Sequence, residues 1–197
     1  ENALAVTSGT AALHLAVLAA GLEPGDEVLV PAYTFPATAN VVVLSGLTPV
    51  LVDVDPETMT IAPAQIRVGP RTKLLLGVHL IGRPLPLHEL PDVPLLEDAA
   101  GALGARYRGR ACGGLGIAGC LSFHPRKIVT TGEGGAITTS DDAFADAVRQ
   151  MRNHGWRSLA PASYWKPFLP FRKLCSRIRT AQKLTWDWER PSLCKAA

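Results

Sequence analysis

The chain has few cysteines, and none of them lie at a metal-binding spacing. The four, Cys112, Cys120, Cys175 and Cys194, form no CxxC pair, whereas zinc sites and redox motifs use closely spaced pairs. Reduced thiols are therefore favoured over a disulfide framework or a zinc site, and we expect no metal.

Long apolar runs are also absent. No window has the roughly 20 consecutive apolar residues that a membrane-spanning helix requires, and the N-terminus lacks the basic and then apolar layout of a secretory signal. We therefore expect a cytoplasmic protein with no membrane partner. Hydrophobic residues make up 47% of the 197 positions, which is enough for a core in one or two domains.

Positive charge is scarce in the first three quarters of the chain. Residues 1–155 have a net charge of −4, with only Lys73 and Lys127 as lysines, whereas residues 156–197 have a net charge of +7 and all four tryptophans. This shift predicts a core over 1–155 and a basic, tryptophan-containing tail over 156–197. A nucleic-acid-binding arm is one interpretation, but no nucleic-acid motif accompanies the charge. We favour a terminal segment that is poorly ordered or docks elsewhere, without a nucleic-acid partner.

Strand-like and helix-like segments alternate from residue 4 to residue 153. The stretch "ALAVTSGT" is predicted to contain the end of a first strand and a turn. Further strands are predicted over 26–31, 49–55, 73–80, 94–98, 119–124 and 135–140. Helices are predicted over roughly 11–20, 37–46 and 140–155. The pattern predicts an α/β fold with a mostly parallel sheet and helices on both faces. Thr7 or Ser8 is expected to cap the first helix, and Ser140 the last, which Gly155 would end.

The first candidate for a binding site is the turn "TSGTAAL". Here a strand gives way to Ser8, Gly9 and Thr10 before a helix starts. Unpaired N–H groups and the helix dipole favour an anion such as phosphate at this position. Ser122, at the end of a later strand, could reach the same anion. The motif is also an ordinary helix start, so by itself it is a weak indication.

Asp98 ends an otherwise apolar strand. A carboxylate at that place costs solvation unless it meets a cation or hydrogen-bond donors. Two interpretations are open: Asp98 caps a following helix, or it faces a protonated ring nitrogen.

Lys127 lies between a short apolar run and a glycine cluster. Its amine is nucleophilic only when neutral, a form that burial and neighbouring cations favour; Arg126, Ile128 and Val129 provide such surroundings. The alternative is a solvated surface lysine. A phosphate turn, a strand-end aspartate and a lysine in this order are together the set that pyridoxal phosphate requires.

The chain resembles the nucleotide-sugar aminotransferases of the DegT/DnrJ/StrS type, which are fold-type I pyridoxal phosphate enzymes. The similar blocks are "SGTAALHLA", "GDEVLVPAYTFPATAN", "TPVLVDVDPETMTI", "LLEDAAGALGARYRG" and "SFHPRKIVTTGEGGAITT". The resemblance implies that Lys127 forms an imine with the cofactor, that Asp98 pairs with its pyridine nitrogen, and that Phe35 stacks on its ring. Gly9, Thr10 and Ser122 would bind its phosphate.

The resemblance also implies a function. An amino acid, glutamate in most relatives, would donate its amino group to a keto-sugar nucleotide, in a homodimer. Two departures are visible: Gly101 stands where relatives usually have glutamine or histidine, and the chain after residue 155 resembles neither the rest of the large domain nor the small C-terminal domain. We therefore expect a partial large domain from which the small domain is missing.

Several alternatives stay open at this point. A catalytically inactive remnant or binding domain would fit the atypical tail, and a sugar dehydratase would fit the cofactor, although related dehydratases replace the lysine by histidine. His79 could line the site or be a hydrogen-bonded strand-end residue. His124 and Glu133 could contact the cofactor, the substrate or a partner subunit.

Overall fold

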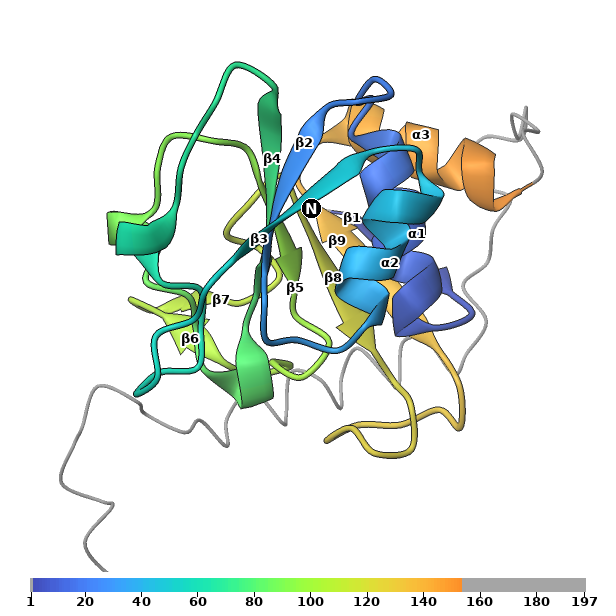
Figure 1. The fold of residues 1–197 in the computed structure, drawn as a ribbon. Coiled ribbons are helices and arrows are strands. Elements are labelled where there is room, and N and C mark those ends of the chain that lie inside the picture. Colours follow the sequence, from blue (N-terminus) through green and yellow to red (C-terminus); the bar gives the residue numbers. More distant parts are fainter. Residues whose placement is uncertain (1, 154–197) are drawn as a thin grey trace, which may run out of the picture. The chain divides into compact units, whose positions relative to one another are not determined.

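The computed structural model describes residues 2–153 (Figure 1), so the tail predicted from residue 156 lies outside the described residues. Seven strands form one sheet in the order β1-β9-β8-β5-β4-β2-β3. These strands are β1 (Asn2–Val6), β2 (Glu27–Pro31), β3 (Thr48–Val52), β4 (Thr72–Val78), β5 (Leu95–Asp98), β8 (Ala118–Ser122) and β9 (Gly135–Thr139). A separate two-stranded ribbon is made by β6 (Arg106–Tyr107) and β7 (Arg110–Ala111).

The two faces of the sheet are covered differently. The α-helices α1 (Gly9–Ala19), α2 (Ala37–Leu44) and α3 (Asp142–Arg152) lie together on one face (Figure 1) and enclose the largest apolar core. The opposite face has a smaller core, which includes Leu29, Leu75 and Leu85. The chain that packs on that side includes the 3-10 helices η1 (Pro63–Gln65) and η3 (Leu87–Glu89). A third 3-10 helix, η2 (Leu80–Gly82), follows β4 at the end of that strand. The prediction of a mostly parallel sheet with helices on both faces is confirmed, with 3-10 helices on the second face.

Strand direction brings several chain segments to one edge of the sheet. β3, β2, β4, β5 and β8 are parallel, and β9 runs antiparallel to both of its neighbours, β8 and β1. The carboxyl ends of parallel strands meet at the same edge, where open α/β sheets bind ligands. Because Gly135 at the start of β9 pairs with both Val6 and Ser122, the ends of β1 and β8 also meet there.

Helix starts follow the expected capping chemistry with one correction. Ser8 caps α1 as predicted, since its Oγ accepts the Ala11 N–H at 3.0 Å. The prediction that Ser140 caps α3 is wrong: Asp141 is the cap, and its Oδ1 accepts the N–H groups of Ala143 and Phe144 at 2.8 and 3.0 Å. A carboxylate that satisfies two orphan donors at the positive end of the helix is the stronger cap. Gly155 lies outside the described residues.

Two glycines allow the β1–α1 turn to approach the strands closely. A Cβ atom at Gly9 would lie 2.8 Å from the Cβ of Ser122, and one at Gly135 would collide with the carbonyl oxygen of Ser8. Real Cβ atoms do not tolerate such contacts, so glycine is required at both places. The turn and the strand ends can therefore form one continuous surface.

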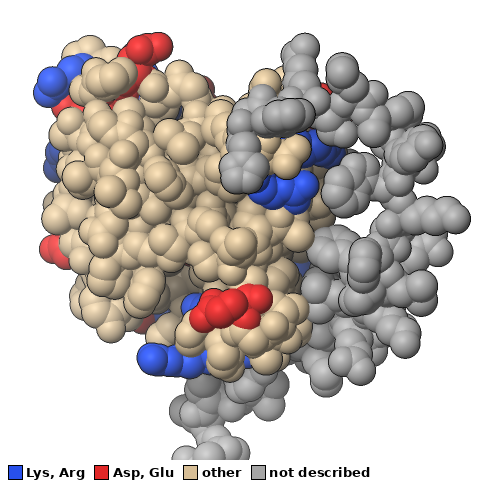
Figure 2. All heavy atoms as spheres, turned by 90° about the vertical axis from the view of Figure 1, so that its right-hand side faces the viewer, with Lys and Arg blue, Asp and Glu red and all other residues tan. Residues whose placement is uncertain are grey.

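Charge is sparse on the helical face. Neither α1 nor α2 contains a Lys, Arg, Asp or Glu, and the part of this face that is visible in Figure 2 is largely free of charged side chains. α2 leaves Val43 and Leu44 exposed. Among the described residues, none of the helices combines the length and the apolar character needed to cross a membrane.

A buried carboxylate joins the centre of the sheet to the loop before β8. Glu97, in β5, is completely buried and accepts N–H groups from Gly113, Leu115 and Gly116 at 2.6, 2.6 and 2.8 Å. His79 Nε2 lies 2.8 Å from it, and His79 Nδ1 accepts the Leu85 N–H, so Nε2 is the nitrogen that donates to Glu97. Burial acts to raise the pKa of Glu97, but the hydrogen bond and charge of His79 and the backbone N–H groups outweigh it and hold that pKa below its usual value.

Replacement of Glu97 by glutamine is expected to destabilise the fold by about 3 kcal/mol, because an amide nitrogen would face backbone donors and leave at least one without an acceptor. Urea unfolding at pH 7 measures the loss. Glu89→Gln, at a side chain that is 55% exposed, is the matched control and should change stability by less than about 0.5 kcal/mol.

A comparison of the wild type with Glu97→Gln at two pH values tests whether the loss of stability is electrostatic. Since the folded state lowers the pKa of Glu97, its contribution is present above the usual value of 4.5 and is lost as the pH falls through the lower folded value. The difference between wild type and Glu97→Gln should therefore shrink in acid. A difference that is equal at pH 7 and in acid would contradict this account.

Candidate active site

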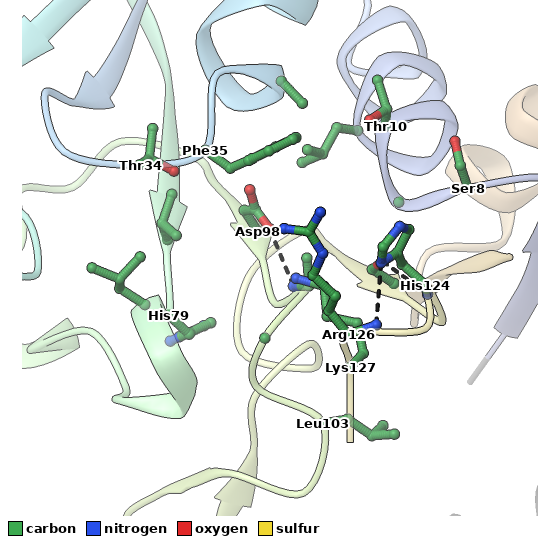
Figure 3. A pocket seen from close by; sticks show the side chains of 18 of the residues that line it. Ser8, Thr10, Thr34, Phe35, His79, Asp98, Leu103, His124, Arg126 and Lys127 are labelled. Atoms are coloured by element: carbon green, nitrogen blue, oxygen red, sulfur yellow. Dashed lines mark hydrogen bonds between the residues drawn. The ribbon is translucent and has the colours of Figure 1, made fainter. Parts of the chain in front are cut away.

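A cavity of about 730 Å³ opens at the carboxyl edge of the sheet, between β4, β5, β8 and the start of α1 (Figure 3). Its lining includes every residue that the sequence predicts for the cofactor: Gly9, Thr10, Phe35, Asp98, Ser122 and Lys127. These positions come from five separate parts of the chain. Proximity alone does not assign a role to any of them, whereas the contacts of each side chain do.

One corner of the cavity is suited to an anion. Gly9 and Thr10 begin α1, so their N–H groups have no acceptor within the helix. Ser122 ends β8 directly beside them, because a Cβ built on Gly9 would lie 3.1 Å from its Oγ. A hydroxyl, a helix N-terminus and a close backbone approach together make a typical phosphate corner.

Asp98 is held at the opposite side of the cavity. Its side chain is buried, with Oδ2 accepting the Thr38 hydroxyl at 2.8 Å and Oδ1 accepting the Ala100 N–H at 3.1 Å. Thr38 gives its proton to Asp98, so Thr34, whose Oγ1 lies 3.0 Å away, donates to Thr38. No helix follows β5 before β6 in the described chain, which removes the interpretation of Asp98 as a helix cap.

The surroundings of Asp98 leave its charge incompletely compensated. Burial raises the pKa of this carboxyl above its usual value, and the opposing effects of Thr38, Ala100, Lys127 and His79 do not offset that increase. A buried carboxylate of this kind gains from a cationic partner in the cavity. A protonated ring nitrogen would be such a partner.

Lys127 lies in the loop between β8 and β9. Its N–H donates to the carbonyl of His124 at 2.9 Å in a tight turn, and Thr130 and Thr131 bind the carbonyl of Phe123 and so close the loop. The side chain is half-buried and lies near enough to Asp98 to lower the pKa of that carboxyl. This placement argues against a simple solvated surface lysine.

The rim of the cavity is apolar and open. Phe35, Ile81 and Ile128 line it and are 71, 85 and 77% exposed. Gly101 lies beside Ile81, where a Cβ atom would be 3.8 Å from the Ile81 nitrogen, so the cavity is wider here than it would be with a side chain. The exposed ring of Phe35 could stack on a planar ligand bound in the cavity.

The histidines and Glu133 have different roles. His79 both lines the cavity and is fully hydrogen-bonded in the core, so the two predicted alternatives are combined. His124 accepts the Arg126 N–H at its Nδ1, and its Nε2 lies 3.7 Å from Glu133. Both His124 and Glu133 line the cavity.

Sequence reasoning missed Thr38 and Thr34 as partners of Asp98. Thr38 is completely buried in a helix whose only other polar residue is Asn40, and a buried hydroxyl needs a polar partner. That was the available signal, but its partner lies 60 residues away in the sequence. The position of Arg126 in the cavity lining was also not predicted.

The residues present fit pyridoxal phosphate. The cavity offers an anion corner, an amine and a buried carboxylate in need of a cation, which match the phosphate, the aldehyde and the pyridinium nitrogen of that molecule. Among the described residues, no group of three or more His, Cys, Asp or Glu side chains is placed to hold a metal ion.

Several known proteins are similar to this chain in sequence and in fold. GDP-perosamine synthase of Caulobacter vibrioides is 43% identical over 190 residues, which cover 92% of this chain and 50% of that protein. DesV of S. venezuelae, solved with a ketimine intermediate, is 39% identical with a TM-score of 0.76, over 82% of this chain and 46% of that one. The E. coli GDP-4-keto-6-deoxy-D-mannose-3-dehydratase, solved with bound hydrated PLP, is 31% identical with a TM-score of 0.76, over 79% and 44%.

The chain spans about half the length of these relatives. The model of the DegT/DnrJ/EryC1/StrS aminotransferase family matches residues 1–178. The resemblance found in the sequence blocks is thereby confirmed, and so is the fold. The chain belongs to the DegT/DnrJ/EryC1/StrS aminotransferase family.

Proposed function

We propose that this chain binds pyridoxal phosphate through Lys127 and serves in the transfer of an amino group from an amino acid to a keto-sugar nucleotide. The observation that carries the proposal is the shared cavity of Lys127, the buried Asp98 and the anion corner of α1. Relatives named as a GDP-perosamine synthase and as a GDP-4-keto-6-deoxy-D-mannose dehydratase support a nucleotide-sugar substrate.

The cofactor would be held at its two ends. The N–H groups of Gly9 and Thr10, with the hydroxyls of Thr10 and Ser122, would bind the phosphate. Asp98 would hold a proton on the pyridine nitrogen, and Thr38 fixes the orientation of its carboxylate. Phe35 would cover the ring. When bound, the cofactor supplies a reactive aldehyde and a ring that takes up negative charge.

Lys127 has two tasks in this scheme. Its amine would hold the aldehyde group of the cofactor. With a donor bound, the same amine would serve as the general base that removes the proton from the donor's α-carbon. Lys127 is half-buried in its loop.

The finer parts of the proposal rest on the family resemblance. Glutamate is the proposed donor, and a homodimer is the proposed assembly. A cytoplasmic location stays a prediction. The domain boundary near Gly155 is likewise proposed, and the family match continues past it to residue 178.

A catalytically inactive binding domain is the competing proposal. The observation in its favour is Gly101, which lines the cavity without a side chain where relatives usually have glutamine or histidine. Amino transfer from glutamate to a keto-sugar nucleotide, measured on the purified chain, would remove it. A dehydratase is disfavoured because Lys127 occupies the position at which related dehydratases have histidine.

Addition of pyridoxal phosphate to the purified chain is expected to give a visible absorption band that borohydride fixes as an adduct on Lys127. Lys127→Ala should lose the band and the adduct, because Lys127 is the only lysine among the described residues that line the cavity. Absorption spectroscopy and peptide mapping measure both.

Lys73→Ala is the matched control, since Lys73 is exposed and its Nζ binds the carbonyl of Pro70 outside the cavity. It should retain the adduct in full. An adduct on another lysine, or none on a chain shown to be folded by circular dichroism, would overturn the assignment of Lys127.

Asp98→Asn is expected to weaken cofactor binding at least tenfold while leaving the cofactor-free chain as stable as the wild type or more stable. The pKa of Asp98 is raised in the folded state, so the folded wild type loses stability as the pH rises from the usual value of 3.8 toward the folded value. The asparagine has no charge to bury, so its advantage should be larger at pH 7 than at pH 4.

Thermal unfolding at both pH values and a cofactor titration test this prediction. Asp92→Asn, at an exposed carboxylate outside the cavity, should change neither quantity. If Asp98→Asn bound the cofactor as tightly as the wild type, Asp98 would have no role in holding the ring.

A further inference from the structure

Arg126 stands out among the arginines that the structure describes. Its guanidinium makes no hydrogen bond, ion pair or ring contact with any described residue, whereas each of the other eight described arginines has such a partner: Arg67, Arg71, Arg83, Arg106, Arg108, Arg110, Arg149 and Arg152. Yet Arg126 lines the cavity and does not simply extend from a remote surface. Although Arg126 is exposed, an arginine that lines a ligand cavity without a partner is available to bind an anionic group of a ligand.

The backbone of Arg126 is fixed even though its guanidinium is unpartnered. Its N–H donates to His124 Nδ1 at 3.2 Å, and the next N–H, of Lys127, donates to the His124 carbonyl at 2.9 Å. Figure 3 shows the side chain extending from this turn into the space between Asp98 and His124. The turn therefore presents Arg126 and Lys127 to the same cavity.

Within residues 2–153, no acidic side chain pairs with Arg126. Of the two carboxylates that line the cavity, Asp98 is bound by Thr38 and Ala100. Glu133 lies 3.7 Å from His124 Nε2 and makes no ion pair with Arg126. The guanidinium is therefore available to an anion that arrives with a ligand.

The neighbourhood of Lys127 points to one ligand group. Arg126 and Lys127 are consecutive residues of one turn, and both line the cavity. In the proposed function an amino donor places its nitrogen where the Lys127 amine reacts, and its α-carboxylate is two bonds from that nitrogen. A guanidinium binds a carboxylate with two parallel hydrogen bonds. The cofactor phosphate has a separate place at Gly9, Thr10 and Ser122.

We propose that Arg126 binds the α-carboxylate of the amino donor. The inference rests on the proposed function, because it requires a donor at Lys127, and it adds a substrate-binding residue that determines specificity for α-amino acids. An amine without the carboxylate would gain nothing from Arg126. Discrimination between the two kinds of amine is therefore the property to measure.

The test uses the full chain loaded with pyridoxal phosphate and titrated with L-glutamate or with 4-aminobutyrate, which lacks the α-carboxylate. The change in the cofactor's absorption gives an apparent dissociation constant for each. Arg126→Ala should raise the constant for glutamate at least tenfold and change that for 4-aminobutyrate less than twofold. For glutamate, Arg126→Lys should give a dissociation constant between those of the wild type and Arg126→Ala, since an ammonium keeps the positive charge but cannot form the two parallel hydrogen bonds of a guanidinium.

Arg67→Ala serves as the control, because Arg67 is exposed and binds only the backbone carbonyls of Ala64 and Ile66. It should match the wild type with both amines. Equal losses for glutamate and 4-aminobutyrate, or no loss for either, would overturn the inference. A weaker affinity of Arg126→Ala for the cofactor itself would also overturn the inference, because it would indicate that the guanidinium binds the cofactor phosphate.

Failure of the underlying function has a different signature. If the folded wild type forms no adduct with the cofactor, the proposed function is wrong and the inference about Arg126 falls with it. If the adduct forms on Lys127 but Arg126→Ala binds glutamate as the wild type does, only the inference is wrong. The cofactor spectrum before any amine is added separates the two results.

Discussion

The alternation of side chains along β5 is the constraint on which the site depends. Successive residues of a strand point to opposite faces of the sheet, so Glu97 and Asp98 cannot share an environment. Glu97 faces the loop before β8 and binds three of its N–H groups, whereas Asp98 faces the helical side and meets Thr38 of α2. The buried Glu97 network thereby fixes the end of the strand that presents Asp98 to the cavity. His79 strengthens this link, since its N–H also donates to the carbonyl of Asp98.

The two adjacent carboxylates differ in how completely they are compensated. Glu97 has three backbone donors and a histidine, enough to hold its pKa below the usual value. Asp98 has one hydroxyl and one backbone N–H, and its pKa is raised by burial. A fully paired carboxylate stabilises the fold and has little affinity left for a ligand, whereas an underpaired one costs stability and gains from a cation. The structure thus places a fully paired acid and an underpaired one at consecutive positions.

Local patterns were sufficient to predict most of the elements and to select residues that line one cavity. Strands and helices follow from hydrophobic periodicity, and Gly9, Asp98 and Ser122 stand at strand ends or a helix start. Lys127 was selected for its place between an apolar run and a glycine cluster. Contacts between distant segments had no such signal: the bond between Thr38 and Asp98 joins residues 60 apart in sequence. The Ser140 cap was wrong for a different reason, because Asp141 is equally competent by residue type and only the backbone geometry decides between them.

The cavity lies within one continuous part of the chain. Its lining runs from Ser8 to Glu133, so the groups proposed for phosphate, ring nitrogen and aldehyde belong to a single unit with its own core. In the proposed function, cofactor binding would depend on interactions that this unit contains, and amino transfer to a sugar nucleotide would be a separate property. The two properties can be separated by experiment. A chain that binds the cofactor at Lys127 and discriminates amines through Arg126 would have the first half of the reaction built into this unit, whether or not the second half is complete.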